Sequence, residues 1–388
     1  QLITYIAGEV LALNNEKAGL PKPIPNTGMY HPDLKDQISA NETEFFNWLN
    51  PKDGQVVIAM GVHRSAIDYE QQQVIDAFIR GVENKGGKAF AFFYEGEDEA
   101  LNYTELLTEN DSARIHLMVN YRALHYVEKR RAEFEKIGVP IIHALNYLDG
   151  DQESFNKALT GVSGNMTPFF LVMPEDTGST DPTIIAGKKD GKNVVFKQQM
   201  TALVERSVNH AKLAITPNQE KRIAAYIWNY PPGEKNVGAA FLDVPSSLVE
   251  ISKSLASKGY QIEQKSSQDY IDAAGSLLRP MYRNENVAGL LDQGLADYLP
   301  LSTYLNWFNQ LPVAVKSPII KRWGKPEEHN MLTDYKGDKA FVIPRYSVGN
   351  LIVLPQGARA DNAKDHGAAY HDMKIPANHA YLAQYLYA

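Results

Sequence analysis

The chain contains no cysteine, which excludes disulfide bonds, thiolate metal sites and cysteine nucleophiles together. It has no excess of basic residues either, since 39 Lys and Arg residues stand against 46 Asp and Glu residues. The resulting formal net charge of -7 argues against a general nucleic-acid-binding protein, because neutralising phosphates requires a basic surface. No run of about 18 apolar residues is present, so the sequence predicts no membrane span.

Signals for the start and the end of a polypeptide are also missing. No initiator methionine, basic leader or signal-peptide core is found at Gln1, and the last residues, Tyr385 to Ala388, continue an apolar helical pattern without a capping glycine. We therefore expect an internal piece of a longer, cytoplasmic polypeptide, in which any membrane association would come from regions outside this chain. Gly233 and Gly238 are not followed by the Gly-Lys-Ser/Thr of a P-loop, so no nucleotide site is predicted.

What is present predicts a folded protein with more than one compact unit. The 388 residues exceed the usual size of a single core, and 44% hydrophobic and 22% charged residues are typical of a globular protein. Residues 1–25 predict an N-terminal helix followed by a linker, because Pro21, Pro23 and Pro25 cannot continue a helix.

Residues 26–215 predict a first α/β module. Apolar runs of strand length alternate with helical patterns, and this alternation indicates a parallel sheet covered by helices. The predicted strands are 55–62, 88–94, 115–120 and 139–144, and the predicted helices are 69–84 and 128–137. A hairpin, 183–186 and 193–197 joined by a turn at 189–192, is expected to close the module.

Residues 216–388 predict a second α/β module. A strand pattern at 222–228 precedes an amphipathic helix at 245–258 that ends at Gly259. A helix-rich insertion then extends to Trp323, and strands return at 340–343 and 351–354. The predicted fold class is therefore α/β, with two tandem modules of mostly parallel sheets.

His63 and Arg64 follow the first strand, at the carboxyl edge where open α/β sheets place their ligands. The planar guanidinium of Arg64 could bind a carboxylate such as a tetrapyrrole propionate. The alternative is an arginine that pairs with a neighbouring acid.

Two loops offer further polar groups. Glu175 lies in a predicted turn after an apolar strand, and Asn229 and Tyr230 open the second module. Both loops are expected to face a cleft, although Asp, Gly and Pro at such positions also simply form turns.

The end of the chain has the highest density of metal-ligating residue types. His371, Asp372, His379 and Tyr381 lie close together in the sequence, and imidazole and carboxylate groups are ligands for Co, Zn or Fe. The two histidines would share one helix face only if Pro376 did not break the helix, and we expect that it does. Helix capping and packing are the alternative roles.

These residues occur within an ordered set of segments that resembles the large CobN / magnesium-chelatase H-subunit family. The resemblance covers nearly the whole chain. It is carried by the segments 26–33 (NTGMYHPD), 61–65 with the helix to Gly86, 173–182 (MPEDTGSTDP), 228–259, 323–326, 349–351 with Gln356, and 370–385.

The resemblance implies a cytoplasm-facing large subunit that binds a tetrapyrrole and inserts cobalt or magnesium, with ATP used only by separate AAA+ ATPase subunits. We expect His371, His379 and Asp372 to be catalytic residues, with both histidines as candidate metal ligands. The expected tetrapyrrole-binding set is His63, Arg64, Glu175, Asn229, Tyr230, Gln356 and Tyr381. The chain would stop before the His-Gly-Thr-x-Glu-Trp segment of the family, so other parts of the same polypeptide would complete the protein.

Departures at 355–359 and 373–375 leave the metal and the ring open. They admit an alternative in the divergent HmuS-like branch, which is linked to removal of iron from haem. A non-catalytic module that closes around a small ligand, or a scaffold for partner subunits, is a further alternative.

Overall fold

The computed structural model describes residues 2–13, 23–69, 71–95, 102–229, 238–239, 241–283, 287–357, 359–360, 372 and 374–388. The chain folds into two compact units, Gln1–Ile215 and Thr216–Ala388. Its first described residues form α1 (Leu2–Tyr5) and the π-helix η1 (Ile6–Val10). The N-terminal helix predicted within residues 1–25 is therefore described from Leu2 to Val10.

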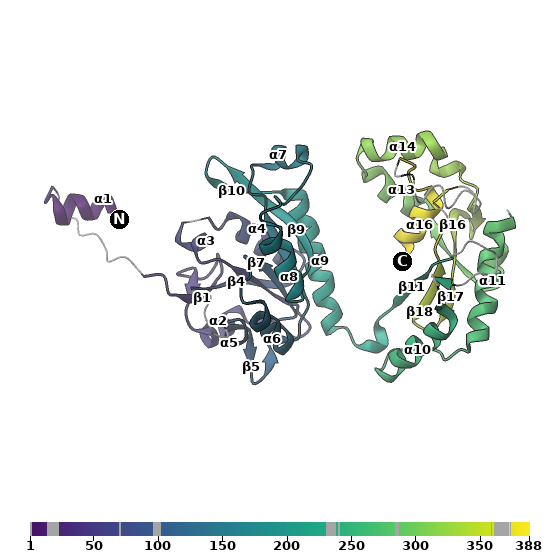
Figure 1. Cartoon of the computed structure of the whole chain (residues 1–388), viewed down its shortest axis with the longest axis horizontal. Helices are drawn as coiled ribbons and strands as arrows, with labels where there is room; N and C mark the ends of the chain where they lie inside the picture. The colour runs from purple at the N-terminus through teal and green to yellow at the C-terminus, as the bar shows by residue number, and fades with distance from the viewer. Residues whose placement is uncertain are drawn as a thin grey trace. The chain divides into compact units, whose positions relative to one another are not determined.

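The first unit is built on an eight-stranded sheet with the order β10-β9-β8-β7-β3-β4-β1-β2 (Figure 1). Its five central strands are parallel: β3 (Val57–Val62), β4 (Lys88–Tyr94), β7 (Leu117–Tyr121), β8 (Ile141–Asn146) and β9 (Thr180–Lys189). The antiparallel edge strands are β1 (Thr27–Tyr30), β2 (Ile38–Ser39) and β10 (Lys192–Val195). The chain passes from β3 to β4 on one side and then to β7 on the other, so the direction of winding reverses at the β3/β7 boundary. In open α/β sheets, ligands bind at the carboxyl ends of the strands at this point.

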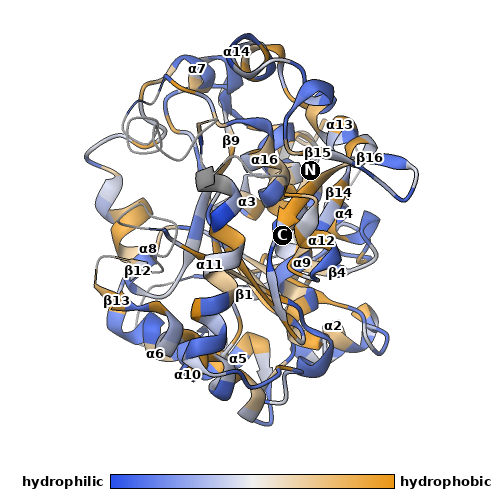
Figure 2. Ribbon diagram, turned by 90° about the vertical axis from the view of Figure 1, so that its right-hand side faces the viewer, coloured by the Kyte–Doolittle hydropathy of each residue, from blue (hydrophilic) through white to orange (hydrophobic). Residues whose placement is uncertain are grey.

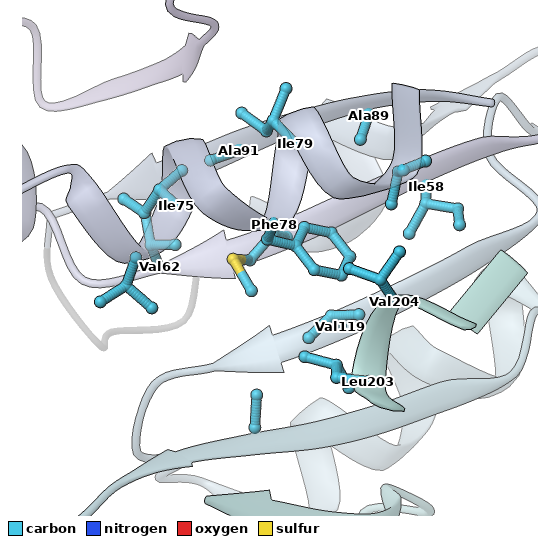
Figure 3. Packing of buried hydrophobic residues seen from close by; sticks show 14 of the residues in the cluster. Ile58, Val62, Ile75, Phe78, Ile79, Ala89, Ala91, Val119, Leu203 and Val204 are labelled. Atoms are coloured by element: carbon cyan, nitrogen blue, oxygen red, sulfur yellow. The ribbon is translucent and has the colours of Figure 1, made fainter. Parts of the chain in front are cut away.

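Helices cover both faces of this sheet because successive residues of a strand face opposite sides. Ile58 and Val62 of β3 pack with Phe78 of α4 and Leu203 of α9 (Figure 3), whereas Val57 belongs to the core of the other face. The helices of this unit are α2 (Glu42–Leu49), α3 (Ser65–Asp68), α4 (Gln73–Asn84), α5 (Asn102–Leu107), α6 (Val127–Ile137), α7 (Gln152–Lys157), η2 (Pro168–Val172), α8 (Met173–Asp176) and α9 (Lys197–Ile215), with a short hairpin of β5 (Thr108–Glu109) and β6 (Ser112–Ala113).

Two predictions for the first unit have different outcomes. The hairpin is confirmed: β9 and β10 pair with Lys189 opposite Lys192, and Asp190 and Gly191 take the positive φ angles of 50° and 76° that suit a two-residue turn. The apolar strand expected before Pro174 is wrong, because residues 168–176 form η2 and α8. This segment connects two parallel strands, β8 and β9, and such a crossover is usually helical.

The second unit contains several small sheets. In one of them β11 (Ile223–Ile227) is parallel to β18 (Leu351–Pro355), and β17 (Tyr346–Val348) is antiparallel to β18. A second sheet is antiparallel throughout and consists of β14 (Ala296–Pro300), β16 (Asp338–Pro344) and β15 (Leu332–Tyr335), and β12 (Gly238–Ala239) pairs with β13 (Leu242–Asp243). Parallel pairing is therefore the rule in the first unit and is limited to β11 and β18 among the described strands of the second. Connection length accounts for two of these antiparallel pairs, since the tight turns between β15 and β16 and between β17 and β18 can join only antiparallel strands.

The helix-rich stretch predicted up to Trp323 is confirmed by α11 (Ser267–Arg283), α12 (Gly289–Asp292), α13 (Leu301–Gln310) and α14 (Val313–Trp323). The other helices described in the second unit are η3 (Asn218–Glu220), α10 (Val244–Ser257), η4 (Pro326–Glu328) and α16 (His379–Tyr387). In Figure 2 the strands are largely orange and the helices carry both orange and blue residues, as expected for helices that cover a sheet with one face. No helix of the described chain is long and apolar enough to cross a membrane.

Candidate functional site at the carboxyl ends of parallel strands

Arg64 lies at the carboxyl end of β3, as predicted, but its guanidinium is already engaged. It forms an ion pair with Glu95, its Nη1 donates to Asn26 Oδ1 at 3.0 Å, and its Nη2 donates to the Ile24 carbonyl at 3.2 Å. A second carboxylate, Asp68 Oδ1, accepts from Nε at 3.3 Å. A ligand carboxylate would have to displace these partners, so the structure favours the alternative in which Arg64 pairs with neighbouring acids.

His63 is exposed at the same edge, and Ser65 fixes its ring. The backbone N–H of Ser65 donates to His63 Nδ1 at 3.1 Å, and the Ser65 hydroxyl lies 2.8 Å from the same nitrogen. Because an N–H can only donate, Nδ1 is the acceptor and Nε2 carries the proton. His63 is therefore oriented as a donor at the carboxyl edge of the first unit.

Glu175 is exposed on α8, on the segment that leads into β9. Arg131 of α6 holds this helix by donating to the Asp176 carbonyl at 2.8 Å and to Asp176 Oδ1 at 2.5 Å. Since β9 is parallel to β3, a helix that ends just before β9 lies toward the amino ends of the strands. Glu175 therefore does not join His63 at the carboxyl edge.

A buried polar cluster beneath this edge was missed by the sequence reasoning. Asn120 of β7 and His143 of β8 are neighbours in the sheet, and His143 Nδ1 lies 3.1 Å from the Asn120 carbonyl. The Tyr103 hydroxyl donates to Asn120 Oδ1 at 3.3 Å, and burial lowers the pKa of His143 to about 4. The signal was present in the sequence, because Asn120 and His143 interrupt apolar strand patterns and buried polar residues are informative.

In the second unit the structure describes three more of the predicted residues. Asn229 follows β11, Gln356 follows β18, and Tyr381 lies on α16, which begins at His379 after the N-cap Asn378. Asn229 and Gln356 are both buried, at the carboxyl end of the parallel pair. We use the name Gln356 cluster for Gln356 and the α16 and β11 residues around it: Tyr226, Tyr381, Gln384 and Tyr385.

The Gln356 cluster combines amides with stacked aromatic rings. The Tyr385 hydroxyl donates to Gln356 Oε1 at 2.8 Å, and the Tyr385 ring stacks on Tyr226 with centroids 4.7 Å apart and planes 10° from parallel. The ring centroids of Tyr381 and Tyr385 are 5.0 Å apart. Burial raises the pKa of Tyr226 to about 12, so its hydroxyl stays protonated and donates to the Gln384 carbonyl at 3.0 Å. Such a surface suits a planar ligand with polar substituents.

Those of the remaining predicted residues that the structure describes, Asp372 and His379, give no metal site. Tyr230 and His371 lie outside the described residues. Asp372 is exposed and forms a turn, since its Oδ1 accepts from Lys374 N at 2.9 Å and its carbonyl accepts from Ile375 N at 3.1 Å.

His379 is fully buried, and both of its ring nitrogens are engaged. Its Nε2 donates to the Gly324 carbonyl at 3.1 Å, and its Nδ1 accepts from the Tyr304 hydroxyl at 2.8 Å. Burial lowers its pKa, and the ring of Phe308 packs edge-on against it. A neutral imidazole without a spare lone pair fits the alternative in which His379 fixes the last helix.

A structural role for His379 predicts the outcome of replacing it. In His379→Ala the Tyr304 hydroxyl and the Gly324 carbonyl lose their partner inside the core, so we expect a loss of about 2 kcal/mol in unfolding free energy. Thermal unfolding of the chain measures this loss. A melting temperature equal to that of the unchanged chain would show that these two hydrogen bonds do not stabilise the fold.

Among the described residues, one group has the spacing of a metal site: His31, Asp33 and Glu83. The guanidinium of Arg80 lies there instead of a cation, since its Nη1 is 2.7 Å from Asp33 Oδ2 and 2.8 Å from Glu83 Oε2. His31 Nδ1 accepts from Asp33 N at 3.1 Å, and His31 Nε2 lies 3.2 Å from Glu83 Oε1. The group is an ion-pair cluster in which the guanidinium of Arg80 bridges two carboxylates.

Comparison with known proteins assigns the family. A family model described as CobN/Magnesium Chelatase matches residues 1–388. The chain belongs to the CobN/magnesium-chelatase family. The predicted resemblance is thereby confirmed, and the family is one of enzymes that insert metals into tetrapyrroles.

Individual members of the family match to different extents. The aerobic cobaltochelatase subunit CobN of Pseudomonas aeruginosa is 30% identical over 387 residues, which is 95% of this chain and 29% of that protein. The magnesium-chelatase H subunit of Chlorobaculum parvum is 28% identical over 257 residues, 62% of this chain and 20% of that protein. The catalytic subunit of cobaltochelatase from Mycobacterium tuberculosis shares the fold, with a TM-score of 0.76, 19% identity, and coverage of 100% of this chain and 32% of that one. The chain thus spans a third or less of the length of these CobN/magnesium-chelatase relatives.

Proposed function

We propose that this chain forms part of the large subunit of a CobN-type chelatase and contributes a tetrapyrrole-binding surface for cobalt or magnesium insertion. The observation that carries the proposal is the Gln356 cluster, in which Tyr381, Tyr385 and a buried amide come together at the carboxyl ends of β11 and β18. Tyrosine rings stack on planar ligands, and the amide offers hydrogen bonds to the substituents of a ring. The metal ion is a substrate of the reaction.

The same proposal places ATP hydrolysis in partner subunits and the rest of the active site in other parts of the polypeptide. ATP would be hydrolysed by AAA+ ATPase subunits that bind the complete large subunit in the cytoplasm, and the remainder of the same polypeptide would supply the rest of the active site. We therefore expect the isolated chain to show no ATPase activity and no metal insertion. Turnover of either kind above a no-protein control, measured with protoporphyrin IX, Mg²⁺ or Co²⁺ and ATP, would contradict this.

Binding of a tetrapyrrole can be tested on the chain itself. Titration with protoporphyrin IX should quench tryptophan fluorescence, because Trp228 is partly exposed directly after β11. Tyr381→Ala should weaken binding about fivefold, since an aromatic contact contributes about 1 kcal/mol.

The matched control is Tyr69→Ala, which removes a tyrosine that is exposed in the first unit. This variant should bind as the unchanged chain does. Equal losses in both variants, or no quenching by protoporphyrin IX in the unchanged chain, would count against the proposed surface.

A further inference from the structure

β11 is the outer strand of the three-stranded sheet with the order β11-β18-β17. The opposite edge of this sheet is partly covered, because Glu263 N donates to the Val348 carbonyl of β17 at 3.3 Å and Ile262 forms a bridge with Gly349. Among the described residues, β11 pairs with β18 alone. In the described part of the chain, β11 therefore forms an open edge of this sheet.

The register shows which backbone groups of β11 face this edge. Ile223 N donates to the carbonyl of Asn350, the residue before β18, at 2.9 Å, so Ile223 turns its backbone groups toward β18. Because these directions alternate along a strand, the N–H and C=O groups of Ala224 and Tyr226 point away from β18. A row of such groups at a sheet edge is a template for pairing with another strand.

The sequence of β11 has none of the features that protect a sheet edge. Its five residues, Ile-Ala-Ala-Tyr-Ile, include no charge and no proline, and all five pair with β18 without a register shift. Other edge strands of the chain do carry charges, with Lys192 in β10 and Asp334 in β15. β11 thus has the sequence of an internal strand.

Both faces of β11 are covered, as in the interior of an α/β sheet. Ile227 belongs to a core with Val244 and Leu248 of α10 on one face. On the other face the ring of Tyr226 stacks on Tyr385 of α16. Parallel strands between two helical layers are apolar along their whole length. A segment that pairs with β11 would lie between the same layers, so it must be apolar and extended.

The position of α16 indicates which kind of strand this edge receives. α16 follows β18 in the chain, and the Gln384 carbonyl accepts from the Tyr226 hydroxyl at 3.0 Å, so the helix lies over β11. Figure 1 shows this end of the chain, in yellow, beside β11. A helix that follows a strand and packs on its sheet usually leads to a further strand parallel to the first. Since β18 already has β11 and β17 as neighbours, such a strand falls at the edge that β11 forms.

We infer that the open edge of β11 binds an apolar, extended segment of the same large subunit from outside residues 1–388, which pairs parallel to β11. The family members compared above are far longer than the segment that this chain matches, so they have polypeptide to supply it. Parallel pairing brings the carboxyl end of this segment beside Asn229. The inference rests on the part of the proposed function that makes this chain a piece of a larger subunit, and it does not depend on tetrapyrrole binding.

Amide hydrogen exchange of β11, resolved by residue, tests the inference by comparing this chain with the full-length subunit. Ala224 and Tyr226 should exchange about 100-fold more slowly in the full-length subunit, because their N–H groups become bonded within a sheet. Ile223 and Ala225, whose N–H groups face β18, should be protected in both proteins. Equal exchange of Ala224 and Tyr226 in the two proteins overturns the inference.

A proline variant distinguishes strand pairing from simple coverage of the edge. Ala224→Pro removes an outward N–H group, a change that edge strands tolerate, so urea unfolding of this chain should be nearly unchanged. In the full-length subunit the same variant should return the Tyr226 amide to the fast exchange of the shorter chain. Slow exchange of Tyr226 in that variant would show that the edge is covered without strand pairing, and it would overturn the inference.

Asp334→Pro in the edge strand β15 is the matched control. Val342 N of β16 donates to the Met331 carbonyl at 3.2 Å, so Met331 faces β16 and Asp334, three positions later, points its N–H group away from it. This variant removes an outward N–H group from a different sheet. It should leave the exchange of Tyr226 slow in the full-length subunit.

A second copy of this chain is the competing occupant of the edge. Sedimentation velocity at micromolar concentration should show a monomer for the unchanged chain and for Ala224→Pro. A dimer that Ala224→Pro dissociates would assign the edge to a second copy and overturn the inference. Titration with protoporphyrin IX is a separate measurement, so failure of the tetrapyrrole surface leaves the assignment of this edge standing.

Discussion

Replacing Glu133 with alanine is expected to lower the unfolding free energy of the first unit by about 3–5 kcal/mol. Glu133 and Arg130 of α6 form an ion pair in which both side chains are 1% exposed. Glu133 Oε1 also accepts from Tyr103 N at 3.0 Å and from Thr104 N at 3.2 Å, at the start of α5. The substitution therefore leaves the Arg130 charge buried without its counter-ion and removes the acceptor for two backbone donors.

Urea unfolding followed by circular dichroism measures this loss. The matched control is Glu205→Ala, which breaks an exposed ion pair with Lys85 at 2.8 Å and should cost less than about 1 kcal/mol. The double variant Arg130→Met/Glu133→Leu should recover part of the loss, because both charges are removed. The backbone donors Tyr103 N and Thr104 N still lack their acceptor in this variant. A Glu133→Ala variant as stable as the control would show that this pair does not stabilise the fold.

Both units are expected to lose stability as the pH falls from about 6.5 to about 4. Burial lowers the pKa of His143 in the first unit and of His329 in the second from 6.5 to about 4, with the nearby His379 adding to the effect on His329. Between these pH values the unfolded chain binds a proton that the folded chain does not, so stability is full above 6.5 and decreases toward 4. Each histidine should contribute a loss of about 3 kcal/mol.

The two contributions can be measured separately. Of the tryptophans, Trp48 lies in the first unit and Trp228, Trp307 and Trp323 lie in the second, so fluorescence in a Trp48→Phe background reports on the second unit. In that background His329→Gln should flatten the dependence of stability on pH, and His143→Gln should not. Stability that is constant between pH 6.5 and 4 in the unchanged chain would contradict the expected burial of neutral imidazoles.

The sequence by itself determined most strands and helices of the first unit, because each of them has an apolar or amphipathic pattern within its own residues. The run 88–94 predicts β4 with the observed bounds, and the alternation of apolar runs with helical patterns predicts the parallel sheet. Asp190 and Gly191 predict the hairpin turn, since this dipeptide accepts two positive φ angles. The ordered segments of the whole chain predicted the family, which the family model confirms.

The tertiary structure decided the features that depend on contacts between distant residues. Neither the pairing of Arg64 with Glu95 nor the placement of His379 between Tyr304 and Gly324 has a signal in the local sequence, because the partners are 31, 75 and 55 positions away. The same holds for the Gln356 cluster, in which a strand end meets a helix 29 positions later in the chain. Composition and periodicity determine which segments form strands and helices, whereas the partners of a buried polar group are set by packing, which brings together residues that no local pattern connects.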